Sequence, residues 1–276
     1  MIRFACEIPV PNLSELSTHT SFDFALTHLV ESNDEYARFY SRQSLSGRFV
    51  MLDNSSFELG KPVSGDRLIN AAIAIKASEI VLPDCLGNRK ETVNNVEKFL
   101  QTYRADLKGL NIKLAAVVQG TGLGEIVKCY EELIKMQEIS TLCIPFDLEL
   151  PEFADIRVNE TQRWMYNRIL VSYAINSWRI DHDCRDSDRR HHLLGASNPY
   201  EVFIQKQFKW IDSIDTSSPI QQGILGVRFN PTFGIVEKNK TKVDFNKAVT
   251  EEQKQDIFYN LRWFGEWCGV GLQKVF

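Results

Sequence analysis

Short apolar runs alternate with longer segments of helical periodicity along most of this chain. The apolar runs are rich in β-branched residues and predict strands at residues 2–10, 48–53, 79–84, 113–120, 141–147, 191–197 and 210–217. The intervening segments place apolar residues three and four apart and predict helices at residues 23–43, 65–77, 90–107, 124–137, 159–178 and 198–210. Strands and helices that alternate at this spacing favour parallel βαβ units.

A run of such units over 276 residues is typical of a (β/α)8 TIM barrel, with an open doubly wound sheet as the competing architecture. The pattern weakens after residue 220, where residues 221–230 and 233–245 resemble further strands and residues 250–269 a closing helix. Trp263, Phe264 and Trp267 have helical spacing there and are expected in the core. We see no linker or repeat, so we expect residues 1–276 to form a single domain.

A polar residue stands at the carboxyl end of almost every predicted strand. In a parallel barrel these ends open on one face, which carries the active site. Each residue alone could simply cap the following helix or form a turn. Taken together they favour convergence on one pocket, and the series consists of Asp53, Asp84, Gln119, Asp147, Ser197 and Asp215.

Composition and charge limit the functions that need consideration. The chain is 43% apolar and 25% charged, as in ordinary globular proteins, and its net charge of −4 gives no global affinity for polyanions. A nucleic acid would therefore need a local basic face. No apolar run reaches the ~18 residues of a membrane span, and no signal pattern opens the chain, so we expect a cytoplasmic protein. The six cysteines lack paired spacing and are expected to be reduced thiols.

Six short segments between residues 50 and 219 resemble, in order, motifs of the tRNA-guanine transglycosylase superfamily. LDNSSFELG is similar to the family's Asp-Ser-Gly-Gly-aromatic-Gln segment. This resemblance implies that Asp53 is the general acid and base and that Phe57 stacks on the bound base. IDSIDTSSP is similar to Val-Asp-Met-Phe-Asp-Cys-Val-Met-Pro and implies that Asp215 is the nucleophile, with Asp212 three residues earlier.

The other four segments imply a site for the base. VLPDCLG resembles the family's Asp-Glu-Cys region, AVVQG its Val-Gln-Gly segment, LCIPFDLE an acidic segment and HHLLGASNP the strand ending in Met-Gly-Val-Gly-Thr-Pro. In this resemblance two residues read the base edge, backbone groups of a third strand bind it and a leucine covers its other face. The implied base-contacting residues are Asp84, Cys85, Gln119, Leu142, Cys143, Asp147, Leu194 and Gly195.

The departures from the family are equally informative. The tRNA enzymes carry a Cys-x-Cys-x2-Cys…His zinc site near the C-terminus, whereas this chain has only Cys268 there and no histidine after His192. Ser55 and Ser56 replace two glycines of the first motif. A barrel without the zinc subdomain is most similar to the 7-deazaguanine DNA transglycosylases, which are often phage-encoded and would act in the host cytoplasm.

The resemblance implies a base exchange that replaces guanine in DNA with a 7-deazaguanine derivative. A carboxylate near C1′ can trap the oxocarbenium-like state of a breaking N-glycosidic bond, and a second can manage the proton on N9. This chemistry needs no metal and no other cofactor. The expected partners are DNA with a flipped nucleotide and a free 7-deazaguanine base, and tRNA is less favoured. Two alternatives stay open: a zinc-less tRNA-guanine transglycosylase, and a non-catalytic barrel that binds nucleobases or nucleic acid.

Several other groupings have simpler interpretations. His182, Cys184, His191 and His192 do not have the spacing of a zinc site, so no metal is expected. A solvated loop or phosphate contacts would explain the arginines at 185, 189 and 190. The lysines at 238, 240 and 242 would lie on one face of a strand, which fits either a guarded sheet edge or contact with phosphates.

Overall fold

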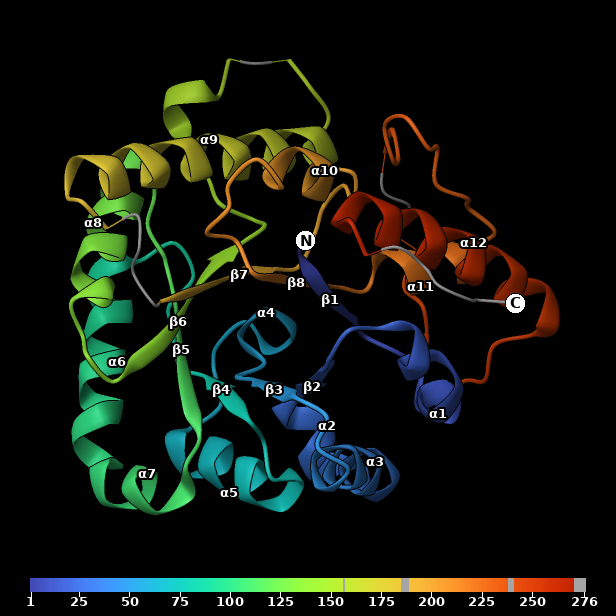
Figure 1. Cartoon of the computed structure of the whole chain (residues 1–276), viewed down its shortest axis with the longest axis horizontal. Coiled ribbons are helices and arrows are strands. Elements are labelled where there is room, and N and C mark those ends of the chain that lie inside the picture. Colours follow the sequence, from blue (N-terminus) through green and yellow to red (C-terminus); the bar gives the residue numbers. More distant parts are fainter. Residues whose placement is uncertain (156, 185–188, 238–240, 271–276) are drawn as a thin grey trace.

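The computed structural model describes residues 1–155, 157–184, 189–237 and 241–270. Eight parallel strands form a nearly closed barrel with helices between them, which confirms the predicted TIM barrel (Figure 1). The strands are β1 (Arg3–Cys6), β2 (Asp23–Leu26), β3 (Val50–Asp53), β4 (Glu79–Val81), β5 (Lys113–Val117), β6 (Ile139–Pro145), β7 (Arg190–Leu194) and β8 (Ser213–Thr216).

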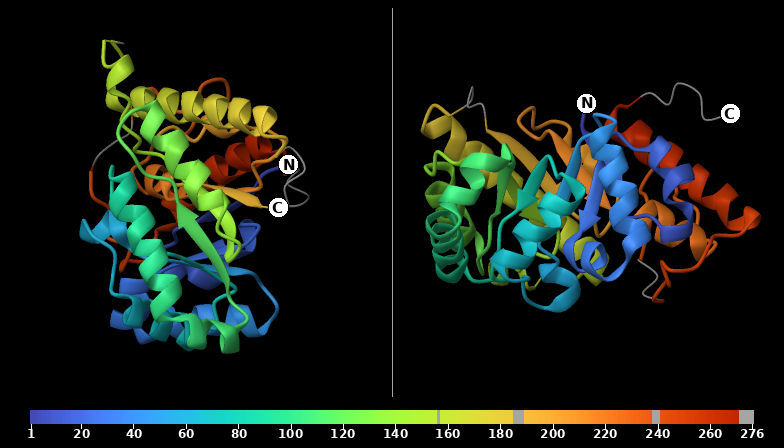
Figure 2. Two further views of the ribbon diagram at one scale, coloured as in Figure 1. Left: turned by 90° about the vertical axis from the view of Figure 1, so that its left-hand side faces the viewer. Right: turned by 90° about the horizontal axis from the view of Figure 1, so that it is seen from below.

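The α-helices lie outside the strands, and side-chain caps fix the starts of several of them. The Asn33, Asn88 and Asn159 side chains each accept a backbone N–H of the following helix, and Thr250 and Gln253 form a capping box. The α-helices are α1 (Leu13–Leu16), α2 (Thr27–Ser32), α3 (Asp34–Leu45), α4 (Ser56–Leu59), α5 (Gly65–Ile75), α6 (Arg89–Thr102), α7 (Arg104–Leu110), α8 (Leu123–Ile134), α9 (Glu160–Asp181), α10 (Glu201–Gln205), α11 (Ser218–Ile224) and α12 (Glu251–Cys268). The right-hand view of Figure 2 shows α12 at one end of the molecule and α6 and α8 at the other.

The strands follow the order β1-β8-β7-β6-β5-β4-β3-β2, so β1 and β2 are the two edges of the sheet. Each other neighbouring pair is joined by a parallel ladder. Between the edges, the Ser21 N–H donates to the Phe4 carbonyl over 2.7 Å. We call this β1–β2 boundary the seam.

Side chains that alternate along the strands fill two separate apolar layers. The inner layer lies within the barrel and includes Phe24, Met51, Val117 and Cys143. The outer layer packs the opposite strand faces against the helices, and it includes Leu52 and Leu142. Because successive strand residues point to opposite faces, Met51 and Asp53 share one direction, and so do Ser213 and Asp215.

The amino-terminal end of the barrel is closed by arginines stacked on aromatic rings. The guanidinium groups of Arg3 and Arg190 lie 5.9 and 5.4 Å from the Phe49 ring centre. Glu79 pairs with Arg190.

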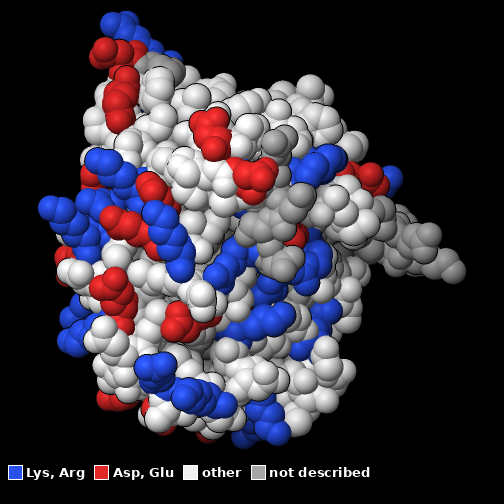
Figure 3. All heavy atoms as spheres, turned by 60° about the vertical axis from the view of Figure 1, so that its left-hand side comes forward, with Lys and Arg blue, Asp and Glu red and all other residues white. Residues whose placement is uncertain are grey.

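Figure 3 shows Lys and Arg side chains gathered near the middle of one face of the molecule.

Two parts of the predicted secondary structure are wrong. Residues 23–43 were expected to be helical throughout, but the segment begins with strand β2 before the helices α2 and α3. Residues 221–230 and 233–245 were expected to be strands. Within the described parts of these segments there is no strand, since α11 takes the start of the first and an isolated bridge joins Asn230 to Gly234.

Other expectations about the chain are met. Phe264 and Trp267 are buried in the core and Trp263 packs against it. All six cysteines are free thiols. None of the described helices combines the length and apolar character that crossing a membrane requires.

Candidate active site

A cavity of about 610 Å³ opens at the carboxyl ends of the strands. Its wall includes the polar residues at or near the carboxyl ends of β3, β4, β5, β6, β7 and β8, which confirms their predicted convergence. These residues are Asp53, Asp84, Gln119, Asp147, Ser197 and Asp215, and Phe57, Leu194 and Gly195 also line the cavity. The structure therefore gathers nine of the predicted residues in one place.

Asp53 ends β3 and leads into a tight turn. Ser55 adopts the left-handed conformation at φ 58°, a region that favours glycine. Its N–H donates to Asp53 Oδ2 over 2.6 Å, and its hydroxyl lies 2.9 Å from the His28 ring nitrogen Nδ1. These bonds hold a backbone conformation that serine rarely adopts, and such strain is commonly found at functional sites.

The Asp53 carboxyl favours its protonated form. Burial raises its pKa well above the ordinary value, and the charge of Glu58 raises it further. Asp215 and Asp84 act in the same direction, whereas the hydrogen bond from Ser55 opposes the shift. Asp53 is thus suited to hold a proton that a neighbouring reacting group could accept.

Asp215 lies on β8 and points into the cavity, with both of its described hydrogen bonds on Oδ1. His192 Nε2 lies 3.0 Å from this oxygen, and the Gly195 N–H donates to it over 3.1 Å. The His192 Nδ1 atom contacts the Ser213 hydroxyl at 2.9 Å. The environment of Asp215 is therefore rich in donors, whereas Asp53 faces other carboxylates.

Asp84 and Gln119 form a buried network with Asn54. Gln119 Nε2 donates to Asp84 Oδ2 over 2.7 Å, and Asn54 Nδ2 donates to Asp84 Oδ1 over 3.0 Å. The Gly87 N–H in turn donates to Gln119 Oε1 over 3.0 Å, which fixes the orientation of the amide. Burial raises the pKa of Asp84, although the bonds from Gln119 and Asn54 oppose this. The two predicted base readers are thus rigidly placed side by side.

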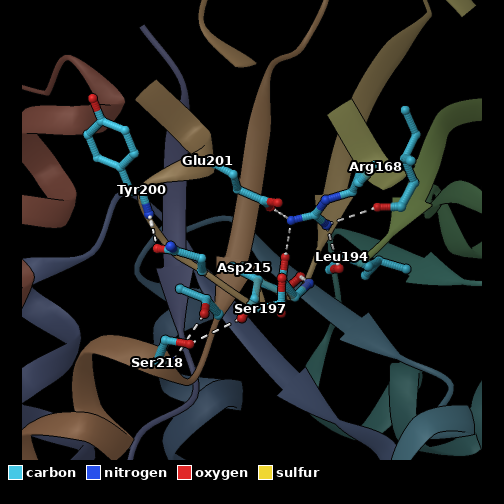
Figure 4. Close-up of polar contacts among 12 residues, drawn as sticks. Arg168, Leu194, Ser197, Tyr200, Glu201, Asp215 and Ser218 are labelled. Carbon is cyan, nitrogen blue, oxygen red and sulfur yellow. Dashed lines mark hydrogen bonds and ion pairs between the residues drawn. The ribbon is translucent and has the colours of Figure 1, made fainter. Parts of the chain in front are cut away.

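A fully buried arginine supports the turn after β7. Arg168 of α9 donates to the Leu194 carbonyl and to the Gly195 carbonyl, each over 2.8 Å, and pairs with buried Glu201 (Figure 4). Burial lowers the pKa of Arg168 to about 9, while the charges of Asp215 and Asp147 oppose this shift. The guanidinium therefore fixes the backbone whose N–H group reaches Asp215.

Three aromatic rings form a rim along one side of the cavity. Phe57 packs edge-on against Phe146, with ring centres 5.2 Å apart, and Phe146 packs likewise against Trp164 at 5.4 Å. The left-handed Gly195 (φ 64°) approaches Phe146 so closely that a Cβ would lie 2.6 Å from the ring. Phe57 is 57% exposed, so its ring offers an open face to a flat ligand.

The cavity wall is strongly acidic. Besides the four aspartates, Glu7, Glu58 and Glu160 contribute to it, and Lys242 is its one lysine or arginine among the described residues. Burial also raises the pKa of Asp147. The lysine positions 238 and 240 lie outside the described residues, as does the arginine position 185. Such a wall favours neutral or cationic groups over phosphates.

Three predicted base-contacting residues are not brought to the cavity wall. Strand β6 continues to Pro145, so the Leu142 side chain lies in the outer layer and that of Cys143 in the inner layer. The Cys143 carbonyl accepts the Val118 N–H, and Pro145 and Phe146 line the cavity instead. The Cys85 backbone bonds with the Thr92 hydroxyl, and burial raises the thiol pKa to about 11.

The residues that line the cavity do not include Asp212, His182 or His191, which contact other parts of the protein. Asp212 precedes β8, at the end of the barrel away from the cavity, where its carboxylate accepts the His191 N–H over 2.8 Å. His191 contacts the Tyr130 hydroxyl, and His182 stacks on Trp178. In the described part of the chain no group of three or more His, Cys, Asp or Glu side chains is arranged to hold a metal ion.

Several residues around the cavity were not predicted from the sequence. Asn54 directly follows Asp53 in the sequence, and Glu58 directly follows Phe57. This proximity was the only feature of the sequence that could have placed them at the cavity. His192 precedes Leu194 by two residues and therefore points the same way from β7. Arg168 lies within a helical pattern that carries no sign of its role.

Comparison with known proteins does not assign the chain to a family. No family model matches the sequence, and no curated protein matches it significantly.

Proposed function

We propose that this protein is a base-exchange transglycosylase that replaces guanine in DNA with a 7-deazaguanine derivative. The observation that carries the proposal is the pairing of Asp53 and Asp215, which share one cavity in contrasting environments. Two carboxyl groups in one cavity, one of them with a raised pKa, are suited to divide acid and nucleophile roles. Their order in the sequence agrees with the motifs that resemble the transglycosylase superfamily.

Asp215 would act as the nucleophile. His192 and Gly195 hold one oxygen of its carboxylate in place, and the carboxylate can bond to C1′ as the glycosidic bond breaks. The product of this step is an ester between Asp215 and the sugar. The electron pair of the broken bond leaves with N9 of the guanine.

Asp53 would act as the general acid and then as the general base. Its raised pKa favours the protonated form, which can supply the proton that the departing base requires. In the second half-reaction the incoming base attacks C1′ and its N9 proton returns to Asp53. The cycle balances without a metal or a redox cofactor.

The remaining residues would receive the base. Guanine presents N–H donors along its pairing edge, which the Asp84 carboxylate can accept, while the Gln119 amide can complement its acceptor. The exposed Phe57 ring and Leu194 would cover the two faces of the flipped base. A cavity of about 610 Å³ has room for a nucleoside. Because the wall is acidic, the phosphates would bind outside it.

Exchange of radiolabelled guanine into DNA and into tRNA, measured in parallel, tests this function. We expect label in DNA only, and we expect a 7-deazaguanine base to displace it. Label in tRNA alone would instead support a zinc-less tRNA enzyme. Binding of nucleic acid without exchange into either would support a non-catalytic barrel.

A further inference from the structure

Both described hydrogen bonds to the Asp215 carboxylate fall on the same oxygen. His192 Nε2 lies 3.0 Å from Oδ1 and the Gly195 N–H donates to it over 3.1 Å. Oδ1 is therefore held from two directions, by a side chain of β7 and by the turn that follows it. This arrangement differentiates the two oxygens of the carboxylate.

His192 donates a hydrogen bond to Asp215 whether its imidazole is neutral or charged. An ionised carboxylate cannot face an unprotonated ring nitrogen favourably, so Nε2 carries the hydrogen. The Nδ1 atom, 2.9 Å from the Ser213 hydroxyl, can accept a hydrogen bond from that hydroxyl or donate one to it. A neutral and a charged imidazole thus both direct an N–H group at Oδ1.

The ring of His192 is fixed in this orientation by packing. It is fully buried and stacks on Phe24, with ring centres 6.1 Å apart and planes 18° from parallel. Phe22 packs edge-on at 6.0 Å. Phe24 itself lines the cavity, so His192 lies directly beneath the cavity wall.

We propose that His192 is a positioning residue for Asp215, which fixes Oδ1 together with the Gly195 N–H and leaves Oδ2 to bond to C1′. The inference rests on the proposed function. The Oδ2–C1′ bond forms as the C1′–N9 bond breaks, and the proton for N9 comes from Asp53. In the ester, Oδ1 is the carbonyl oxygen and keeps both hydrogen bonds.

This geometry affects the two half-reactions differently. When the incoming base attacks C1′, Asp215 must leave as a carboxylate, and charge develops on Oδ1. Donors aimed at that oxygen strengthen as the charge grows and therefore accelerate release. Formation of the ester moves charge away from Oδ1, so the same donors do not assist it electrostatically. Loss of His192 should consequently slow release more than formation.

The test uses a guanine-containing oligonucleotide and follows the covalent adduct on denaturing gels, with 7-deazaguanine added to release it. In His192→Phe, which keeps a flat ring but no donor, we expect release about 10- to 100-fold slower than in the wild type, with accumulation of adduct. His192→Gln should restore much of the rate, because its amide nitrogen can replace Nε2. His191→Phe is the matched control on the outer face of β7 and should release adduct at the wild-type rate.

The outcomes separate this inference from the function on which it rests. A wild-type protein that forms no adduct contradicts the proposed function. A wild-type adduct combined with equally fast release in His192→Phe overturns the role of His192 and leaves the function standing. If His192→Phe does not fold, His192→Asn replaces it, since asparagine reaches Ser213 but not Asp215. Equal release rates in the Asn and Gln variants would then overturn the inference.

Discussion

The Gln119 amide nitrogen donates to the Asp84 carboxylate over 2.7 Å, so the two proposed base readers are bonded to each other. Asn54 donates to the other oxygen of the same carboxylate. A base that contacts Asp84 therefore meets a carboxylate whose position is already fixed. Such preorganisation reduces the ordering cost of binding.

Removal of Asp84 should weaken binding of the free base. We expect Asp84→Ala to cost about 1 to 3 kcal/mol, because a donor of the base then remains buried without an acceptor. Isothermal titration with guanine measures the change. Asp106→Ala, an exposed site on α7, is the control, and unchanged affinity in Asp84→Ala would remove Asp84 from the base site.

Asp215→Asn should abolish both the covalent adduct and base exchange while DNA binding survives. The substitution keeps the side-chain volume but removes the nucleophilic charge. A denaturing gel detects the adduct, and ping-pong kinetics of exchange by the wild type would accompany it. Exchange that persists in this variant would show that the nucleophile is wrong. Asp212 could not replace Asp215 without a large rearrangement, since it lies at the other end of β8.

Asp53→Asn should slow both half-reactions by about 10²- to 10⁴-fold, because it removes the proposed proton carrier. The asparagine oxygen can still accept the Ser55 N–H, so the turn should keep its shape. Single-turnover rates of adduct formation and release measure the effect. Loss of only one of the two rates would contradict a shared acid and base.

Asp53→Asn should also increase the stability of the folded protein at high pH. The pKa of Asp53 is raised in the folded protein, so above the ordinary aspartate pKa the folded state retains a proton that the unfolded state has released. Stability therefore falls as the pH rises through the raised pKa, and Asp53→Asn avoids this loss. Thermal midpoints should be higher in the variant at pH 8, by about 2 to 4 °C for each kcal/mol regained, and should converge near pH 4.

A comparison within one pH series isolates this effect. Burial lowers the pKa of His191 to about 3, which destabilises the fold below the ordinary histidine pKa in wild type and variant alike. The difference between the two proteins cancels that contribution. A variant no more stable than wild type at pH 8 would contradict the cost assigned to Asp53.

Arg168 should contribute to stability only together with Glu201. Arg168→Met leaves a buried carboxylate without its partner and should cost about 3 to 5 kcal/mol in urea denaturation. The double variant Arg168→Met with Glu201→Leu removes both charges and should recover much of the loss. A double variant as unstable as Arg168→Met would show that the carbonyl contacts of Arg168, rather than the ion pair, dominate.

The sequence was sufficient to predict the barrel and the convergence of its polar strand ends, because both follow from periodicity and from the parallel arrangement of strands. Strand β2 was missed because Leu26 is followed directly by the first helical residue, Thr27, without an intervening turn residue. Residues 221–230 combine β-branched and apolar side chains, yet Pro219 at the helix start favours α11 there.

The contacts within the site could not be derived in the same way. His192 and Asp215 are 23 residues apart, and their hydrogen bond depends on the relative register of β7 and β8. Arg168 reaches Gly195 from a helix whose packing on the barrel determines the contact. Periodicity tells which way a side chain points, but not which partner it meets.

The seam between β1 and β2 separates the two proposed catalytic groups along the barrel wall. Asp215 stands on β8 beside β1, and Asp53 stands on β3 beside β2. Among the described neighbouring strands, this is the boundary without a ladder of backbone hydrogen bonds. A change in the spacing of β1 and β2 would alter the distance between the two carboxyl groups without breaking a ladder. The distance between the proposed acid and the proposed nucleophile therefore depends on how β1 packs against β2, and not on a continuous run of paired strands.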